Sequence, residues 1–124
     1  MTMTRSAPPL LYDPLALSRL IDEPYRNLSL ATVNDHEIRM SVMTEPFHWH
    51  RHPDSDETFY GVDGELIVQF VDREVVVGPG QFVTVPAGTL HCTRPAGKRS
   101  VNLTFERAGA ATVFETPPDA APDR

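Results

Sequence analysis

The chain has 124 residues, a formal net charge of −6 at pH 7 and a single cysteine, Cys92. This length suits one domain with its own apolar core, and one cysteine excludes an internal disulfide and a cysteine-rich zinc site. The acidic balance argues against a nucleic-acid partner, and no apolar run approaches the length of a membrane span. An N-terminus without an apolar signal core, together with the lone cysteine, favours a cytoplasmic location.

A short helix is predicted near the N-terminus, after a flexible arm over residues 1–11, which are polar and lack a repeating pattern. Asp13 has the properties of an N-cap residue, and Pro14 follows it at the first helical position. The helix is expected to continue to Ile21. One of its faces is apolar and is expected to pack against the outside of the barrel or a second subunit, through Leu17, Leu20 and Ile21.

The middle of the chain alternates with period two between short Gly- and Pro-rich turns, which predicts an all-β domain. Strands are expected over residues 28–32, 38–42, 48–52, 57–62, 66–71, 75–77, 82–85, 99–106 and 112–114. The last residues, 116–124, are rich in Pro, Asp and Ala and predict a disordered tail. Residues 12–115 are therefore expected to form a single domain.

Four of the five histidines fall in two short blocks of the chain. His48, His50 and His52 alternate along one predicted strand, so we expect all three imidazoles on the same face. His91 follows a later strand and a Pro-Ala-Gly turn. Imidazoles that converge in this way are typical of a metal site, although histidines hydrogen-bonded inside a barrel without a metal are the alternative reading.

The two blocks resemble the paired motifs of the cupin family. The first motif, over residues 48–64, is H-x-H, four residues, Glu, six residues and Gly, and is met by His50, His52, Glu57 and Gly64. The second motif, over residues 80–91, is Gly, five residues, Pro, one residue, Gly, two residues and His, and is met by Gly80, Pro86, Gly88 and His91. Where the family often has Asn four residues after this last His, the chain has Pro95.

The resemblance implies a jelly-roll barrel, also called a double-stranded β-helix, here with a short N-terminal helix. It also implies four ligands for one divalent transition metal (Fe, Mn, Ni, Cu or Zn), namely His50, His52, Glu57 and His91. The turn at residues 53–56 resets the strand alternation, so Asp56 is the alternative carboxylate ligand, or else caps the turn.

Beyond the ligands, His48 is the candidate catalytic residue, because its intrinsic pKa lies close to neutral pH and it shares the parity of the ligands. The alternative places His48 in water at the entrance of the strand. The rest of the cavity is expected to be walled by Leu, Val and Phe with few further polar groups. Cys92 is expected to point away from His91 as a buried structural thiol.

Two functions from different classes are compatible with these residues. One is a metal-dependent enzyme, dioxygenase- or isomerase-like, that acts on a small oxygen-bearing substrate. The other is a non-catalytic module that binds or senses a small ligand. In either case we expect a small-molecule partner, no nucleic acid or membrane partner, and a homodimer, because small barrels have sheet edges and apolar faces to cover.

Overall fold

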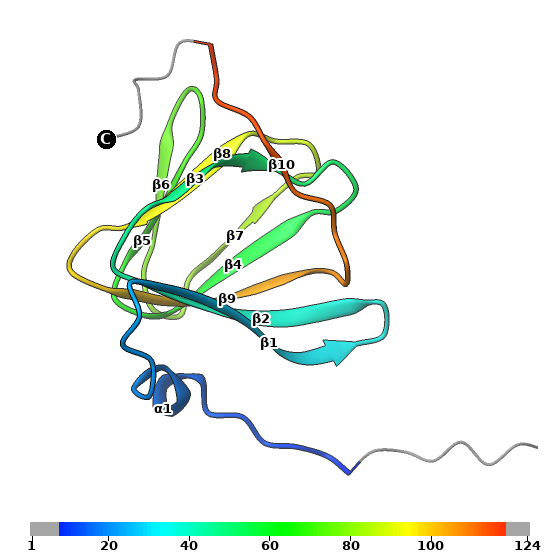
Figure 1. Ribbon diagram of the computed structural model, residues 1–124, viewed down its shortest axis with the longest axis vertical. Helices are drawn as coiled ribbons and strands as arrows, with labels where there is room; N and C mark the ends of the chain where they lie inside the picture. Colours follow the sequence, from blue (N-terminus) through cyan, green and yellow to red (C-terminus); the bar gives the residue numbers. More distant parts are fainter. Residues whose placement is uncertain (1–7, 119–124) are drawn as a thin grey trace, which may run out of the picture.

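The computed structural model describes residues 8–118 and consists, over that range, of one short helix and ten strands. The strands form two antiparallel sheets that face each other as the walls of a barrel (Figure 1). The all-β jelly-roll prediction is confirmed. The elements are α1 (Pro14–Ser18), β1 (Tyr25–Val33), β2 (His36–Met43), β3 (Phe47–Arg51), β4 (Glu57–Asp63), β5 (Leu66–Gln69), β6 (Glu74–Val77), β7 (Phe82–Val85), β8 (His91–Pro95), β9 (Ser100–Arg107) and β10 (Val113–Phe114).

The chain passes back and forth between the two sheets. The first sheet has the strand order β1-β2-β9-β4-β7, and the second has the order β10-β3-β8-β5-β6. The first motif, over residues 48–64, therefore spans both sheets, because it begins on β3 and continues on β4. Side chains that point inward from the two sheets meet across the barrel interior.

The interior core closes one part of the space between the sheets. Its fully apolar cluster comes from the end of β2 and from four other strands of the two sheets, and consists of Met43, Phe59, Leu66, Val68, Val77 and Val85. Each such side chain contributes about 1.5–3 kcal/mol when it is removed from water. The remaining interior is the cavity described below.

A second apolar cluster lies on the outer face of the first sheet. Met40, Val42 and Val101 are buried there, and Leu17 and Ile21 pack against them. Helix α1 thus covers this face, beneath the first sheet in Figure 1. These contacts explain how strands β2 and β9 are apolar on the side that faces away from the cavity.

The helix begins as predicted and ends earlier than predicted. The Asp13 side chain accepts a hydrogen bond from the Ala16 N–H (3.1 Å), and Pro14 occupies the first turn. The helix ends at Ser18, whose carbonyl accepts a hydrogen bond from the Arg99 guanidinium. Because the chain leaves the helical path there, Leu20 is 81% exposed and does not pack against the barrel as Leu17 and Ile21 do. Its contact with a second subunit stays a prediction.

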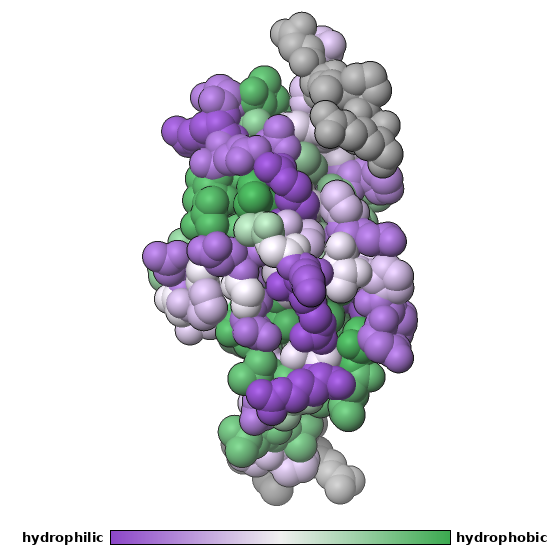
Figure 2. Space-filling model, turned by 90° about the vertical axis from the view of Figure 1, so that its left-hand side faces the viewer, coloured by the Kyte–Doolittle hydropathy of each residue, from purple (hydrophilic) through white to green (hydrophobic). Residues whose placement is uncertain are grey.

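The ends of the chain hold the predicted arm and tail, and the hydropathy of its surface varies from region to region (Figure 2). Residues 1–7 of the predicted arm and 119–124 of the predicted tail lie outside the described residues. Within residues 8–118, no helix has the length and apolarity needed to cross a membrane. On the face shown in Figure 2, apolar side chains gather in separate patches above and below a more hydrophilic middle.

Candidate metal centre

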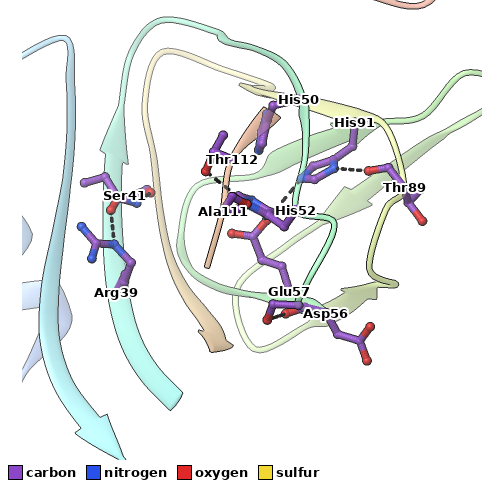
Figure 3. A network of polar contacts seen from close by, with 12 residues as sticks. Arg39, Ser41, His50, His52, Asp56, Glu57, Thr89, His91, Ala111 and Thr112 are labelled. Atoms are coloured by element: carbon purple, nitrogen blue, oxygen red, sulfur yellow. Dashed lines mark hydrogen bonds and ion pairs between the residues drawn. The ribbon is translucent and has the colours of Figure 1, made fainter. Parts of the chain in front are cut away.

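Three histidines and one glutamate, drawn from both sheets, meet inside the barrel. His50 lies within β3, His52 directly follows that strand, His91 begins β8, and Glu57 begins β4. One ligand atom from each residue lies within 4.8 Å of the other three, and all four residues are buried (Figure 3). The structure thus brings together the four residues that the motif spacing singled out.

A turn in the second motif is attached directly to the first motif. The N–H of Gly88 donates to the carbonyl of His52 (2.8 Å), and the N–H of Ala87 donates to the Asp56 carboxylate (2.8 Å). Gly88 has φ = 81°, a left-handed conformation that favours glycine. The spacing between Pro86, Gly88 and His91 therefore sets where β8 starts, and Asp56 caps this turn while Glu57 joins the histidines.

The histidine strand departs from simple alternation. In the pairing of β3 with β8, the register shifts between Phe47 and His50, which is the signature of a β-bulge. Phe47, His50 and His52 line the cavity, whereas His48 is exposed and is not among the lining residues. The expectation that His48 shares the face of His50 and His52 is wrong because of this bulge. A catalytic role for His48 stays a prediction.

Each ligand histidine is oriented by a backbone carbonyl. The Nδ1 atom of His50 lies 2.7 Å from the carbonyl oxygen of His48, that of His91 lies 2.8 Å from the carbonyl oxygen of Thr89, and that of His52 lies 3.0 Å from the carbonyl oxygen of Ala111. A carbonyl only accepts hydrogen bonds, so these contacts assign the proton to Nδ1 in all three rings. The Nε2 atoms are then left as the metal-binding atoms.

The Nε2 atoms converge on one carboxylate. His52 Nε2 and His91 Nε2 each lie 3.2 Å from Glu57 Oε1. In the Nδ1–H tautomer, both Nε2 atoms present lone pairs, which repel the lone pairs of the carboxylate unless a proton or a cation lies between them. The buried Nε2 of His52 makes its contact with Glu57 outside hydrogen-bond geometry. This arrangement fits a cation.

Burial and the Glu57 charge set the ionisation of the cluster. Burial lowers the pKa of His50 to about 4, so this ring is neutral at pH 7 and ready to bind a metal. The contact with Glu57 outweighs burial at His52 and raises its pKa to about 9. Burial alone raises the pKa of Glu57, but the contacts with His52 and His91 lower it to about 2.

The donor set defines which metals suit the site. Three imidazole nitrogens and one carboxylate oxygen match Fe, Mn, Ni, Cu or Zn as divalent ions, and Glu57 offsets one unit of the cation's charge. His50, His52, Glu57 and His91 are the residues that would hold such an ion. The buried His/Glu cluster is therefore compatible with a metal site.

The cluster opens onto a cavity of about 450 Å³ whose wall combines polar and apolar side chains. The prediction of a cavity walled by Leu, Val and Phe is wrong. Tyr25, Phe47 and Phe59 do line it, but so do many polar side chains of the first sheet, namely Asn27, Glu37, Arg39, Ser41, Asn102, Thr104 and Glu106. The apolar residues between them on β2 face the helix instead.

Part of this wall is internally hydrogen-bonded. The Asn27 amide donates to Ser41 Oγ (2.7 Å), and Arg39 donates through Nε to Asn27 and through Nη1 to Glu37 (3.0 Å). Figure 3 shows Arg39 and Ser41 on β2, across the interior from the histidines. Next to them on β9, burial and the charge of Glu57 raise the pKa of Glu106 to about 7.

The sequence contained a signal for these residues that the ligand motifs obscured. Glu37, Arg39 and Ser41 occupy alternate positions of one predicted strand, and Asn102, Thr104 and Glu106 occupy alternate positions of another. Alternation indicates two faces but does not say which face is inside. A cavity walled by Leu, Val and Phe requires the apolar faces to be inside, whereas on β2 and β9 these faces pack against Leu17 and Ile21 outside the barrel.

The double-stranded β-helix and the buried three-histidine, one-glutamate cluster together define a small cupin-type barrel with a candidate metal centre. The cupin domain model matches residues 33–105, and the chain belongs to the cupin family. The chain is 42% identical over 101 residues to the uncharacterized protein YdbB of Bacillus subtilis, a match that covers 81% of this chain and 88% of that protein.

Solved structures with the same fold share little sequence with the chain. A cupin-2 domain protein from Shewanella frigidimarina is similar with a TM-score of 0.72 at 22% identity, covering 78% of this chain and 94% of that one. A double-stranded β-helix protein from Klebsiella pneumoniae has a TM-score of 0.74 at 13% identity, covering 92% of this chain and 98% of that one. These similarities establish the fold.

Proposed function

We propose that this cupin is a metal-dependent enzyme, dioxygenase- or isomerase-like, that acts on a small oxygen-bearing substrate. The carrying observation is the convergence of His50, His52, His91 and Glu57 at a cavity large enough for a small molecule. A metal held there supplies Lewis acidity or dioxygen activation. The protein's own contribution is to orient the ligands through backbone carbonyls and to surround the substrate with polar groups.

The enzyme reading is supported by ionisable groups beyond the ligands. Glu106 lines the cavity beside Glu57, and its pKa of about 7 suits proton transfer near neutral pH. His48 remains the second candidate, now from the exposed side of β3. Glu106→Gln and His48→Ala, each with its metal content measured, distinguish the two: the residue that moves the proton is the one whose loss abolishes turnover while the metal is retained.

Elemental analysis of protein purified without added metal or chelator tests the metal first. A His50→Ala/His91→Ala double variant, prepared in the same way, is the control. Near-stoichiometric Fe, Mn, Ni, Cu or Zn in the wild type and none in the variant supports the proposal. If both preparations are empty and added metals leave the melting temperature unchanged, the proposal fails.

The alternative function is a non-catalytic module that binds or senses a small ligand. The hydrogen-bonded wall of Asn27, Arg39 and Glu37 favours it, because a fixed polar surface suits recognition as well as catalysis. Metal-loaded protein that binds small hydroxy or keto acids without consuming dioxygen or isomerising them supports this alternative over the enzyme.

A further inference from the structure

Two buried polar side chains of β9 face the cavity without a hydrogen-bond partner among the described residues. Asn102 is 1% exposed, and neither its Nδ2 nor its Oδ1 is paired; Thr104 is 2% exposed, and its Oγ1 is unpaired. Both line the cavity. Buried polar groups in folded proteins are nearly always hydrogen-bonded, so groups left in this state inside a cavity point to a ligand.

The cross-strand register places these groups relative to the metal centre. Glu106 lies opposite Glu57, Thr104 opposite Phe59, and Asn102 opposite Gly61. At the usual rise of an antiparallel strand, the Thr104 row is about 7 Å and the Asn102 row about 13 Å further along the barrel than the Glu57 row. A ligand that reaches from the metal centre to Asn102 therefore has an extended chain.

The charges around the cavity disfavour a second anionic group on that ligand. Glu37, Glu57 and Glu106 all line the cavity, and the guanidinium of Arg39 is bonded to Glu37 and to Asn27. A carboxylate at the Asn102 row would lose its hydration close to these acidic groups. The positive charge of Arg39 is already paired with the carboxylate of Glu37. A neutral group does not meet this cost.

The donors and acceptors on β9 match hydroxyl groups. Asn102 offers a donor and an acceptor side by side, and the Thr104 hydroxyl acts as either. A ligand hydroxyl is likewise both donor and acceptor, so it pairs with each of them. The bonded side chains of β1 and β2 hold the adjoining part of the same sheet in place.

We propose that Asn102 and Thr104 form a recognition subsite for the uncharged, hydroxyl-bearing end of a chain whose other end chelates the metal. The proposal rests on the proposed function, since the chelating end requires a metal at His50, His52, Glu57 and His91. It assigns to Asn102 and Thr104 the selection of a polyhydroxylated ligand over an apolar or dianionic one of the same length.

Isothermal titration calorimetry on zinc-loaded protein tests this with three acids of equal carbon number. The three acids share the α-hydroxycarboxylate end and differ in the rest of the chain. Gluconate carries hydroxyls there, 2-hydroxyhexanoate carries methylenes, and glucarate carries hydroxyls and a second carboxylate. Wild type is expected to bind gluconate about tenfold or more tightly than either of the others, as expected for at least one buried hydrogen bond. Asn102→Leu and Thr104→Val are expected to lose that preference and to keep the affinity for 2-hydroxyhexanoate.

Thr84→Val is the matched control, because Thr84 is exposed and its hydroxyl bonds to Thr58 on the outer face. It should retain the preference for gluconate. The melting temperature of metal-free protein gives a second readout, since replacing unpaired buried polar groups with apolar ones is expected to leave it unchanged or raise it. A clear fall in both Asn102→Leu and Thr104→Val assigns them a structural role and overturns the proposal.

Zinc content measured on the same samples separates the two levels of the proposal. The subsite proposal alone is overturned if the protein holds zinc but binds none of the acids, binds them equally or prefers an acid other than gluconate. It is also overturned if both variants keep the preference for gluconate. Protein that holds no zinc overturns the proposed function. In that case, comparison of gluconate with 2-hydroxyhexanoate on the metal-free protein decides the subsite, with equal or absent binding overturning it.

Discussion

Zinc binding is expected to compete with a proton on His52. The contact with Glu57 raises the His52 pKa from 6.5 to about 9, so this ring carries a proton at neutral pH in the metal-free protein. A metal takes the place of that proton at Nε2. The zinc-binding constant should therefore rise about tenfold per pH unit from pH 6.5 to 8 and level off above pH 9, with about one proton released per zinc.

The same proton affects the stability of the metal-free protein. Because the folded-state pKa of His52 is raised, its contribution is fully present below pH 6.5 and is lost as the pH rises to 9. The interval between these values corresponds to about 3 kcal/mol at most. Urea unfolding in the presence of chelator, performed in the Glu106→Gln background to remove the other group titrating nearby, should show this loss.

Glu57→Gln provides the control for both measurements. Without the carboxylate, the His52 pKa is no longer raised, so zinc affinity should be lower overall and nearly independent of pH between 7.5 and 9. Competition titrations with a chromophoric chelator, repeated in buffers of different ionisation enthalpy, measure the affinity and the protons released. A wild-type affinity that does not change with pH, or a Glu57→Gln variant with the wild-type slope, would refute the reasoning.

Three further predictions concern other parts of the molecule. In metal-free protein, Glu106→Gln should raise the unfolding free energy at pH 8 by up to about 3 kcal/mol and leave it unchanged at pH 4.5. The reason is that the Glu106 pKa is raised from 4.5 to about 7, so stability is lost as the pH rises across that interval. Urea titrations at the two pH values measure this effect, and an equal effect at both values contradicts the prediction. Gly88→Ala should destabilise the protein by about 1 kcal/mol, because residue 88 has a positive φ that strains any residue with a Cβ. Gly97 has neither a positive φ nor a close neighbour, so Gly97→Ala should be nearly neutral in thermal melts. Equal effects of the two substitutions would contradict the backbone explanation. The proposed homodimer should give twice the 13.8 kDa chain mass in light scattering. Phe82 is 68% exposed on the outer face beside Tyr60, so Phe82→Ser should reduce the measured mass to that of one chain. A wild-type monomer at micromolar concentration rules out the dimer.

The sequence was sufficient for the fold and for the four clustered residues. His50, His52, Glu57 and His91 were identified because their spacing resembles the cupin motifs, and the same motifs include the turn residues that bring them together, such as Gly88 with its positive φ. Asp13 was likewise identified as a helix cap from local chemistry. Such features depend on residues that are close together in the sequence, so the sequence displays them directly.

Features that depend on tertiary packing were not accessible in the same way. The prediction that His48 shares the face of His50 and His52 was wrong because a bulge in β3 changes the side-chain parity, and no residue type marks a bulge reliably. Its exposure agrees with the alternative that placed it in water. The polar wall was missed because helix α1 covers the apolar face of β2 and β9, so that Arg39, Asn102 and Thr104 face the interior. Both errors concern which face of a strand is inside, and only the assembled barrel decides that.

The placement of Glu57 and His91 on opposite sheets has a consequence for chain entropy. The two residues are 34 positions apart, and a cation bonded to both closes the intervening segment into a loop. In chain-entropy terms, a persistent cross-link of that length restricts the unfolded chain by about 4 kcal/mol, as a disulfide would. In a protein whose single cysteine cannot form such a bridge, a metal bound at this cluster would take over this role, and metal supply instead of redox state would then govern the resistance of the barrel to opening.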